Sequence, residues 1–176
     1  MDRHSEKIAN LERMRGLAAY DLFHPGLGER LQAICRHSAE RLGMPIAAVQ
    51  AVLDTATATL AATATIGASD GEHLLVATGG GPNEFAFCPQ VVLDGAPFIA
   101  EDLAQDPAHG ANPIVRAGLI RSYAGVPLRL PAGHVLGSHC VMGGDPHAFT
   151  DADVADLTAA GDEVMAAIRD YELVRA

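Results

Sequence analysis

Apolar residues recur at the spacing of an amphipathic helix at both ends of the chain. A first helix is predicted over residues 5–22 and a second over about 27–42, with Gly43 as its C-terminal stop. The last helix is predicted to begin after Thr150, whose hydroxyl suits an N-cap. Its apolar positions repeat at a 3-4-3-4-3 spacing: Val154, Leu157, Gly161, Val164, Ile168 and Tyr171. Such a stripe is typical of a coiled-coil seam, but a helix that covers a sheet carries the same pattern.

Between these helices, apolar and polar positions alternate with the period of a β-strand. Strands are predicted over residues 46–53, 58–66, 73–77, 98–101, 121–130 and 134–142. The first two strands and the last two are each joined by a short turn, which predicts two hairpins. Residues 79–83 are expected to form a loop, and short helices are expected from Cys88 and from Pro113. Because hairpins pair antiparallel, we expect an α+β fold with a central antiparallel sheet of about six strands.

Composition and charge narrow the choice of partners and location. A chain of 176 residues is long enough for one domain with its own core. The net charge of −10 repels phosphate backbones and anionic membranes, so neither nucleic acid nor a membrane is an expected partner. No apolar run is long enough to span a bilayer or to act as a leader. The three cysteines are odd in number and far apart, which favours reduced thiols and a cytoplasmic location.

Several short motifs follow one another in the second half of the chain. They are Phe87-Cys88, Pro97-Phe98-Ile99-Ala100-Glu101-Asp102, Asp106-Pro107, Asn112-Pro113, Arg121-x-Tyr123-Ala124-Gly125-Val126-Pro127-Leu128, Gly133-x-x-Leu136-Gly137-x-x-Cys140-Val141 and Phe149-Thr150. Each motif is weak alone, but in this order and spacing they resemble the GAF domain family over residues 27–172. The chain departs from the family pattern at Ala86, where Ser is common, and at His139, where an apolar residue is common.

The resemblance implies an arrangement and a class of function. In the family, terminal helices pack on one face of the sheet, and a ligand pocket lies on the other face under short helices and loops. Members bind cyclic nucleotides, haem, bilins, nitrate or small metabolites, or serve as dimerising connectors, so the resemblance names neither ligand nor cofactor. We therefore expect a GAF domain over residues 25–176, preceded by a helix within 1–24, that senses a small molecule. It would signal through its terminal helices to a protein such as a kinase or regulator.

The predicted hairpin over residues 121–142 suggests which side chains face the ligand. Because side chains alternate along a strand, Arg121 and Tyr123 share one face and Ser122 lies on the other. We expect His139 of the partner strand to converge with them, and Arg121 to favour an anionic ligand. In the alternative, Arg121 only lies at the end of the sheet and His139 is a hydrogen-bonded core histidine. The expected ligand contacts are Phe87, Asp102, Ile114, Arg121, Tyr123 and His139.

Catalysis and metal binding are not expected. Cys88 begins a helix, where the helix dipole favours a thiolate, but no basic residue is adjacent and a structural thiol is the simpler interpretation. A redox enzyme of the methionine sulfoxide reductase type is considered because free methionine sulfoxide reductases share the fold that the resemblance implies. It is the less favoured alternative because their cysteine-bearing loop is not evident in this sequence. The eight histidines include no i,i+4 pair, and the chain has no Cys-x-x-Cys, so no metal site is predicted.

The terminal helices also predict self-association. The helix over residues 5–22 lies outside the family match and has an apolar face to bury. Pairing both terminal helices with those of a second copy would form a four-helix bundle, so we expect a homodimer. Gly161, in the middle of the last helix, would then mark a close approach of two helices. In the alternative, the first helix folds back on its own chain and the last one covers the sheet. A dimerisation or docking module without a ligand is the second function considered.

Overall fold

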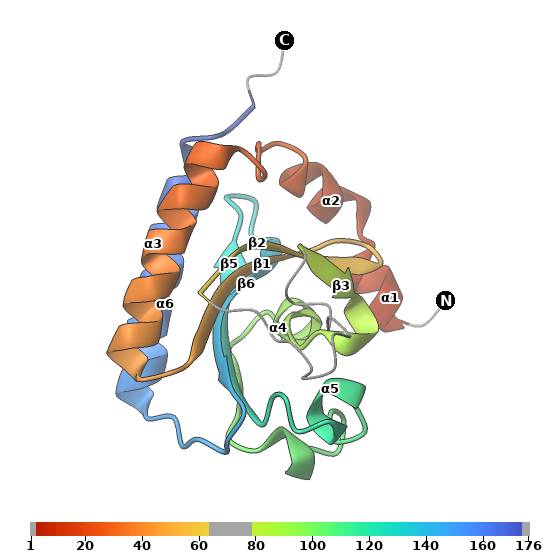
Figure 1. The fold of residues 1–176 in the computed structure, drawn as a ribbon. Helices are drawn as coiled ribbons and strands as arrows, with labels where there is room; N and C mark the ends of the chain where they lie inside the picture. The colour runs from red at the N-terminus through yellow and green to blue at the C-terminus, as the bar shows by residue number, and fades with distance from the viewer. Residues whose placement is uncertain (1–2, 64–78, 174–176) are drawn as a thin grey trace.

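The computed structural model describes residues 3–63 and 79–173. Within these residues, one antiparallel sheet of six strands forms the centre of the molecule, in the order β3-β2-β1-β6-β5-β4 (Figure 1). The strands are β1 Ile46–Val52, β2 Ala56–Ala62, β3 Gly80–Pro82, β4 Phe98–Ala100, β5 Ser122–Arg129 and β6 Val135–Gly143. The predicted α+β fold is confirmed, and so are the two hairpins, β1–β2 and β5–β6.

Helices lie on both faces of this sheet. They are α1 Arg3–Ile8, α2 Leu11–Leu17, α3 Pro25–Leu42, α4 Cys88–Asp94, α5 Pro113–Arg116 and α6 Asp151–Arg169, with short 3-10 turns at η1 Asn83–Phe85 and η2 Leu103–Gln105. The long helices α3 and α6 lie side by side on one face, and α4 and α5 lie on the other (Figure 1). Each face has its own hydrophobic cluster. Across the described ranges, no helix has the combined length and hydrophobicity that a transmembrane segment needs.

Local signals in the sequence set the ends of both long helices. Thr150 Oγ1 accepts a hydrogen bond from the backbone N–H of Asp153 at 3.1 Å, and the Asp153 carboxylate accepts one from the N–H of Thr150 at 2.8 Å. This reciprocal capping box fixes the start of α6. Helix α3 starts at Pro25, two residues before the predicted start, because proline suits the first turn of a helix. It stops at Gly43, whose φ of 64° is left-handed.

The apolar stripe of α6 covers the sheet of its own chain. Leu157 and Ile168 are fully buried in the same cluster as Val126 of β5. A Cβ at Gly161 would lie 3.2 Å from Cγ2 of Val126, so the glycine permits a close approach of helix and sheet. The hypothesis that this stripe is a dimer seam is therefore wrong, and Gly161 marks a helix–sheet contact.

The prediction of one helix over residues 5–22 is also wrong. Asn10 interrupts it, because its side-chain oxygen accepts a hydrogen bond from Arg13 N at 3.0 Å and caps a new helix, α2. The chain then folds back on its own protomer, where Leu17 and Tyr20 join the cluster under α3 and α6. Burial of these two residues therefore requires no second copy of the chain.

Residues 80–82 form an edge strand, β3, where a loop was expected. The strand pairs with β2 and places Gly80 opposite Ala58. Gly80 has a φ of 135°, and a Cβ there would collide with the carbonyl oxygen of Thr57, so only glycine fits. A glycine-rich segment carries no hydrophobic alternation, which is why the pattern does not predict this strand. The strand predicted over residues 73–77 lies outside the described residues.

Candidate functional site

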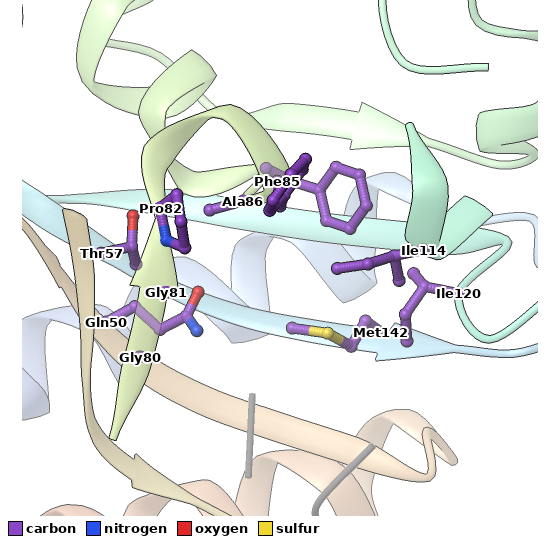
Figure 2. A pocket seen from close by; sticks show the side chains of 11 residues that line it. Gln50, Thr57, Gly80, Gly81, Pro82, Phe85, Ala86, Ile114, Ile120 and Met142 are labelled. Atoms are coloured by element: carbon purple, nitrogen blue, oxygen red, sulfur yellow. The ribbon is translucent and has the colours of Figure 1, made fainter. Parts of the chain in front are cut away.

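A small cavity lies on the sheet face that is turned away from α3 and α6 (Figure 2). Its volume is about 30 Å³, which holds roughly one or two water molecules. The described residues that line it are Gln50, Thr57, Gly80, Gly81, Pro82, Phe85, Ala86, Phe87, Ile114, Ile120 and Met142. None of these residues is charged, and Gln50 and Thr57 supply the polar side chains in an otherwise apolar wall.

Gln50 of β1 connects the cavity to a buried polar network. Its side chain points into the cavity (Figure 2). Gln50 Oε1 accepts a hydrogen bond from the thiol of Cys88 at 2.6 Å, and Nε2 donates to Thr59 Oγ1 at 3.3 Å. A side-chain amide nitrogen carries two N–H groups, and the second one of Gln50 has no partner among the described residues. Within the described part of the chain, the cavity therefore presents one hydrogen-bond donor without a partner.

Cys88 is the centre of this network. Its sulfur accepts a hydrogen bond from Ser138 Oγ at 2.9 Å and lies 3.2 Å from Tyr123 Oη. Burial raises the pKa of Cys88, but hydrogen bonds with Cys140, Ser138 and Tyr123 outweigh burial and leave this pKa below that of an ordinary thiol. The same burial raises the pKa of Tyr123. All three cysteines of the chain are buried, so none is open to a bulky reagent in this state.

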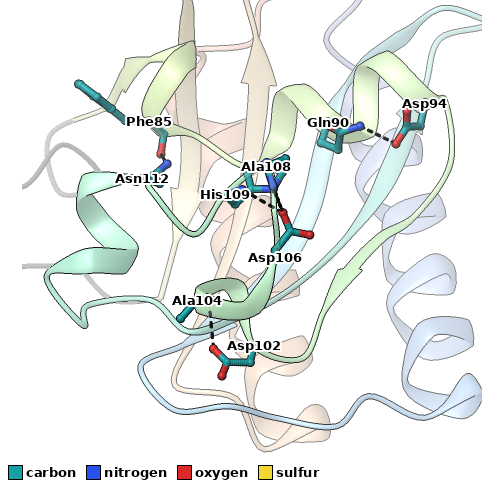
Figure 3. Close-up of polar contacts among 9 residues, drawn as sticks. All are labelled: Phe85, Gln90, Asp94, Asp102, Ala104, Asp106, Ala108, His109 and Asn112. Carbon is teal, nitrogen blue, oxygen red and sulfur yellow. Dashed lines mark hydrogen bonds and ion pairs between the residues drawn. The ribbon is translucent and has the colours of Figure 1, made fainter.

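Aromatic rings and a short loop cover Tyr123. The centroid of its ring lies 5.5 Å from that of Phe87 and 5.6 Å from that of Phe98. The ring of His109 lies 5.0 Å from that of Phe98, and its Nδ1 lies 2.8 Å from Asp106 Oδ1 (Figure 3). Burial raises the pKa of Asp106, but hydrogen bonds from His109 and its backbone outweigh it and lower the pKa. Tyr123 is therefore a buried wall residue, one layer behind the cavity.

Arg121 and Asp102 bind each other and do not line the cavity. Arg121 Nε and Nη2 each donate to one carboxylate oxygen of Asp102 at 2.7 Å, which is a two-point ion pair. The hydrogen bond from Arg121 lowers the pKa of Asp102. Because Asp102 already occupies the guanidinium fork, the structure gives no support to an anion held by Arg121 in the cavity.

His139 lies on the opposite face of the sheet, so the prediction that it converges with Arg121 and Tyr123 is wrong. Its Nδ1 lies 3.0 Å from the carbonyl oxygen of Ala48, and its Nε2 lies 2.8 Å from Ser38 Oγ on α3. A carbonyl only accepts hydrogen bonds, so Nδ1 donates and Nε2 accepts in the neutral ring. Burial lowers the pKa of His139 to about 4, which keeps the ring neutral. His139 is thus a fully hydrogen-bonded core histidine.

The pairing of β5 with β6 explains this placement. Tyr123 lies opposite Met142, and Val126 lies opposite His139. Met142 and Tyr123 belong to the cavity-side cluster, whereas Val126 belongs to the cluster under α3 and α6. Alternation groups residues correctly within each strand, but it does not say which face of one strand meets which face of the next.

The six residues expected to contact the ligand therefore lie in four different places. Phe87 and Ile114 line the cavity, and Tyr123 lies behind it. Asp102 and Arg121 form their own ion pair, and His139 faces α3. The sequence interpretation missed Gln50, although it is the one polar residue in the apolar segment Ile46–Val52. Among the described residues, no group of three or more His, Cys, Asp or Glu side chains is arranged to hold a metal ion.

Solved structures of known proteins share this arrangement. The GAF domain of a phosphoenolpyruvate-protein phosphotransferase from Acinetobacter is similar with a TM-score of 0.62 and 12% identity, over 97% of this chain and 95% of that one. The type II free methionine-R-sulfoxide reductase from Thermoplasma acidophilum is similar with a TM-score of 0.65 and 18% identity, over 87% of this chain and 99% of that one. At such low identities the likeness shows a common fold alone.

Sequence comparison gives a relative and a family. The cyclic di-GMP phosphodiesterase PA2567 of Pseudomonas aeruginosa is 37% identical over 89 residues, which is 49% of this chain. That match spans 15% of the length of the phosphodiesterase, so it concerns one segment of a larger protein. The sequence model of the GAF domain matches residues 26–168, most of the chain. The chain belongs to the GAF domain family.

Proposed function

We propose that this protein is a regulatory module that binds a small uncharged molecule in the cavity beside Gln50 and performs no chemistry of its own. GAF domains are typical of sensory and regulatory proteins, and a relative of part of this chain is named a cyclic di-GMP phosphodiesterase. None of the described lining residues is charged, which favours an uncharged ligand, because an ion in an apolar wall would lose its hydration without a partner. This replaces the anionic ligand that Arg121 suggested.

The observation that carries the proposal is the second N–H of Gln50, which has no partner among residues 3–63 and 79–173. A buried polar group without a partner is costly, so such groups usually bind something. The rest of the amide is already fixed by Cys88 and Thr59, which hold the donor in place. A ligand with one hydrogen-bond acceptor and an apolar body would match this wall.

Binding requires the cavity to widen, because about 30 Å³ is far below the volume of a metabolite. We propose that a ligand selects a wider state and that β1 transmits the change. Gln50 of β1 faces the cavity, and the carbonyl of Ala48, two residues away, bonds to His139, which bonds to Ser38 of α3. A shift of β1 would therefore reach α3 through two hydrogen bonds. Coupling of this kind is typically worth about 1–3 kcal/mol.

Native mass spectrometry of the protein purified from its own host tests the proposal. A retained ligand adds mass to the 18.3 kDa chain, and its released form gives the composition and charge. An uncharged compound with a hydrogen-bond acceptor is the expected result. A bare chain, with no thermal stabilisation by any extract of the host, would contradict ligand sensing.

The second candidate is a dimerisation or docking module without a ligand. The small volume of the cavity favours it, because a collapsed pocket needs no occupant. The homodimer stays a prediction. The apolar faces of the terminal helices do not support it, since the described part of the chain buries the α6 stripe and much of the N-terminal segment itself. Sedimentation at micromolar concentration tests the dimerisation form of this candidate: twice the chain mass supports it, and a monomer at high concentration contradicts it.

A redox enzyme is the least supported function. The likeness to free methionine-R-sulfoxide reductase shows only the fold, and the thiols of Cys35, Cys88 and Cys140 are all buried. Burial also raises the pKa of Cys35 to about 12. We expect iodoacetamide at neutral pH to modify the folded protein more slowly than a free thiol at every cysteine. One cysteine that reacts much faster would favour the enzyme.

A further inference from the structure

A second cavity, the basic groove, lies between the N-terminal segment, the end of α4 and the β5–β6 turn. Its charged or titratable side chains are Lys7, Arg13, Asp94, Arg129 and His134. Its volume is about 330 Å³, at the lower end of the roughly 300–1,000 Å³ that is common for small-molecule sites. It shares no lining residue with the cavity beside Gln50. The two are therefore separate sites.

Arg13 places a buried positive charge in the wall of the groove. Its side chain is 2% exposed, and its nitrogens donate to carbonyl oxygens, including that of Val52 at 2.8 Å and that of Ile8 at 3.0 Å. No carboxylate among the described residues contacts it, and Asp54 acts on it only at a distance. Burial lowers the pKa of Arg13, but a guanidinium stays protonated in proteins. The carbonyls satisfy the hydrogen bonds and leave the charge uncompensated.

Two more cations stand at the rim of the groove. Lys7 donates to the carbonyl oxygen of Leu93 at 2.6 Å, and Arg129 donates to the carbonyl oxygen of Gly95. These bonds cap the end of α4, but an ammonium has three N–H groups and a guanidinium has five, so donors remain. The opposing carboxylate, Asp94, accepts from Gln90 Nε2 at 2.8 Å. Among the described lining residues, three cations thus face one carboxylate, in a chain whose net charge is −10.

We propose that the basic groove binds a small free anion of the phosphate or carboxylate class. Such an anion would compensate the charge of Arg13 across the apolar wall formed by Val92 and Val135. It would also accept charge-assisted hydrogen bonds from Lys7 and Arg129 at the rim. Neither contact depends on a ligand beside Gln50, so the groove is a site of its own.

The test uses the full chain and two probes, inorganic phosphate and acetate, at constant ionic strength made up with sodium chloride. Backbone amide signals of Gly95, Gly133 and His134 in a two-dimensional NMR spectrum report binding. We expect these signals to shift saturably with phosphate, with acetate, or with both, and the stronger probe identifies the class of anion. Replacing Arg129 by Gln should weaken binding about tenfold, because one charge-assisted hydrogen bond is lost.

Two further variants serve as controls. Arg36→Gln removes an equal charge from the exposed side of α3, on the other face of the sheet, and should leave binding unchanged. Arg129→Lys keeps the charge and should retain most of the affinity, which separates loss of the anion contact from loss of the fold. Shifts that merely follow ionic strength, or equal weakening in Arg36→Gln and Arg129→Gln, would overturn the proposal.

Discussion

The two faces of the sheet bury different polar networks. Under α3 and α6, His139 uses both ring nitrogens, one with Ala48 and one with Ser38. On the cavity side, Cys88 is fully bonded, but one N–H of the Gln50 amide has no partner in the described residues. The first face also holds the buried hydroxyl of Ser122, which has no partner among the described residues, whereas on the second face a cavity lies beside Gln50. We infer that one face provides stability and the other is kept for binding.

The largest expected effect comes from truncation on the packed face. Leu157→Ala removes a fully buried side chain under Val126, so it should lower the free energy of unfolding by about 2–5 kcal/mol. Leu11→Ala is the control, because that leucine is 60% exposed and its loss should cost less than about 0.5 kcal/mol. Urea denaturation measures both. Similar losses in the free energy of unfolding for the two variants would contradict the tight packing of this face.

A pH effect follows from His139. Its pKa is about 4 in the folded chain and about 6.5 when unfolded, so the unfolded state binds more protons between these values. The contribution of His139 to stability is therefore fully present above pH 6.5. It is lost as the pH drops towards 4, by on the order of 3 kcal/mol. In His139→Gln this slope should largely disappear, whereas His37→Gln, an exposed control, should keep it. Equal slopes in urea denaturation of both variants would contradict the buried neutral ring.

A smaller effect is expected from Tyr123, whose hydroxyl contacts Cys88 and Ser138. Tyr123→Phe removes those hydrogen bonds and should cost about 0.5–1.5 kcal/mol in stability. The neighbouring residue Ser122 serves as the comparison, because its Oγ is buried and has no hydrogen-bond partner among the described residues. Ser122→Ala should therefore be neutral or slightly stabilising in thermal unfolding. A larger loss in Ser122→Ala than in Tyr123→Phe would reverse the assignment of the two faces.

Much of the fold was predictable from local signals. Alternation and short turns located the two hairpins, and Thr150 located the start of α6. The failures have local causes as well. Asn10 prefers to cap a helix, which splits the predicted first helix. The strand at Gly80 depends on pairing with Thr57 and Ala58, and no pattern within the strand itself reports that pairing.

The site was less predictable than the fold. Phe87 and Ile114 were among the expected ligand contacts, and both line the cavity. His139 was misplaced because the match between faces of neighbouring strands is a tertiary property. Arg121 looked like an anion contact until the fold brought Asp102 to its guanidinium. Gln50 left a signal, a lone amide in a buried strand, but its partner Cys88 is 38 residues away in sequence.

The most direct test of the account is the dependence of a bound ligand on Gln50. Gln50→Leu keeps the size of the side chain and removes its donor, while Gln32→Leu makes the same change on α3, away from the cavity. All three proteins are purified from the host and compared by native mass spectrometry. The account predicts the same added mass on the wild type and on Gln32→Leu, and a bare chain for Gln50→Leu. An undiminished added mass on a folded Gln50→Leu would contradict the claim that this amide holds the ligand.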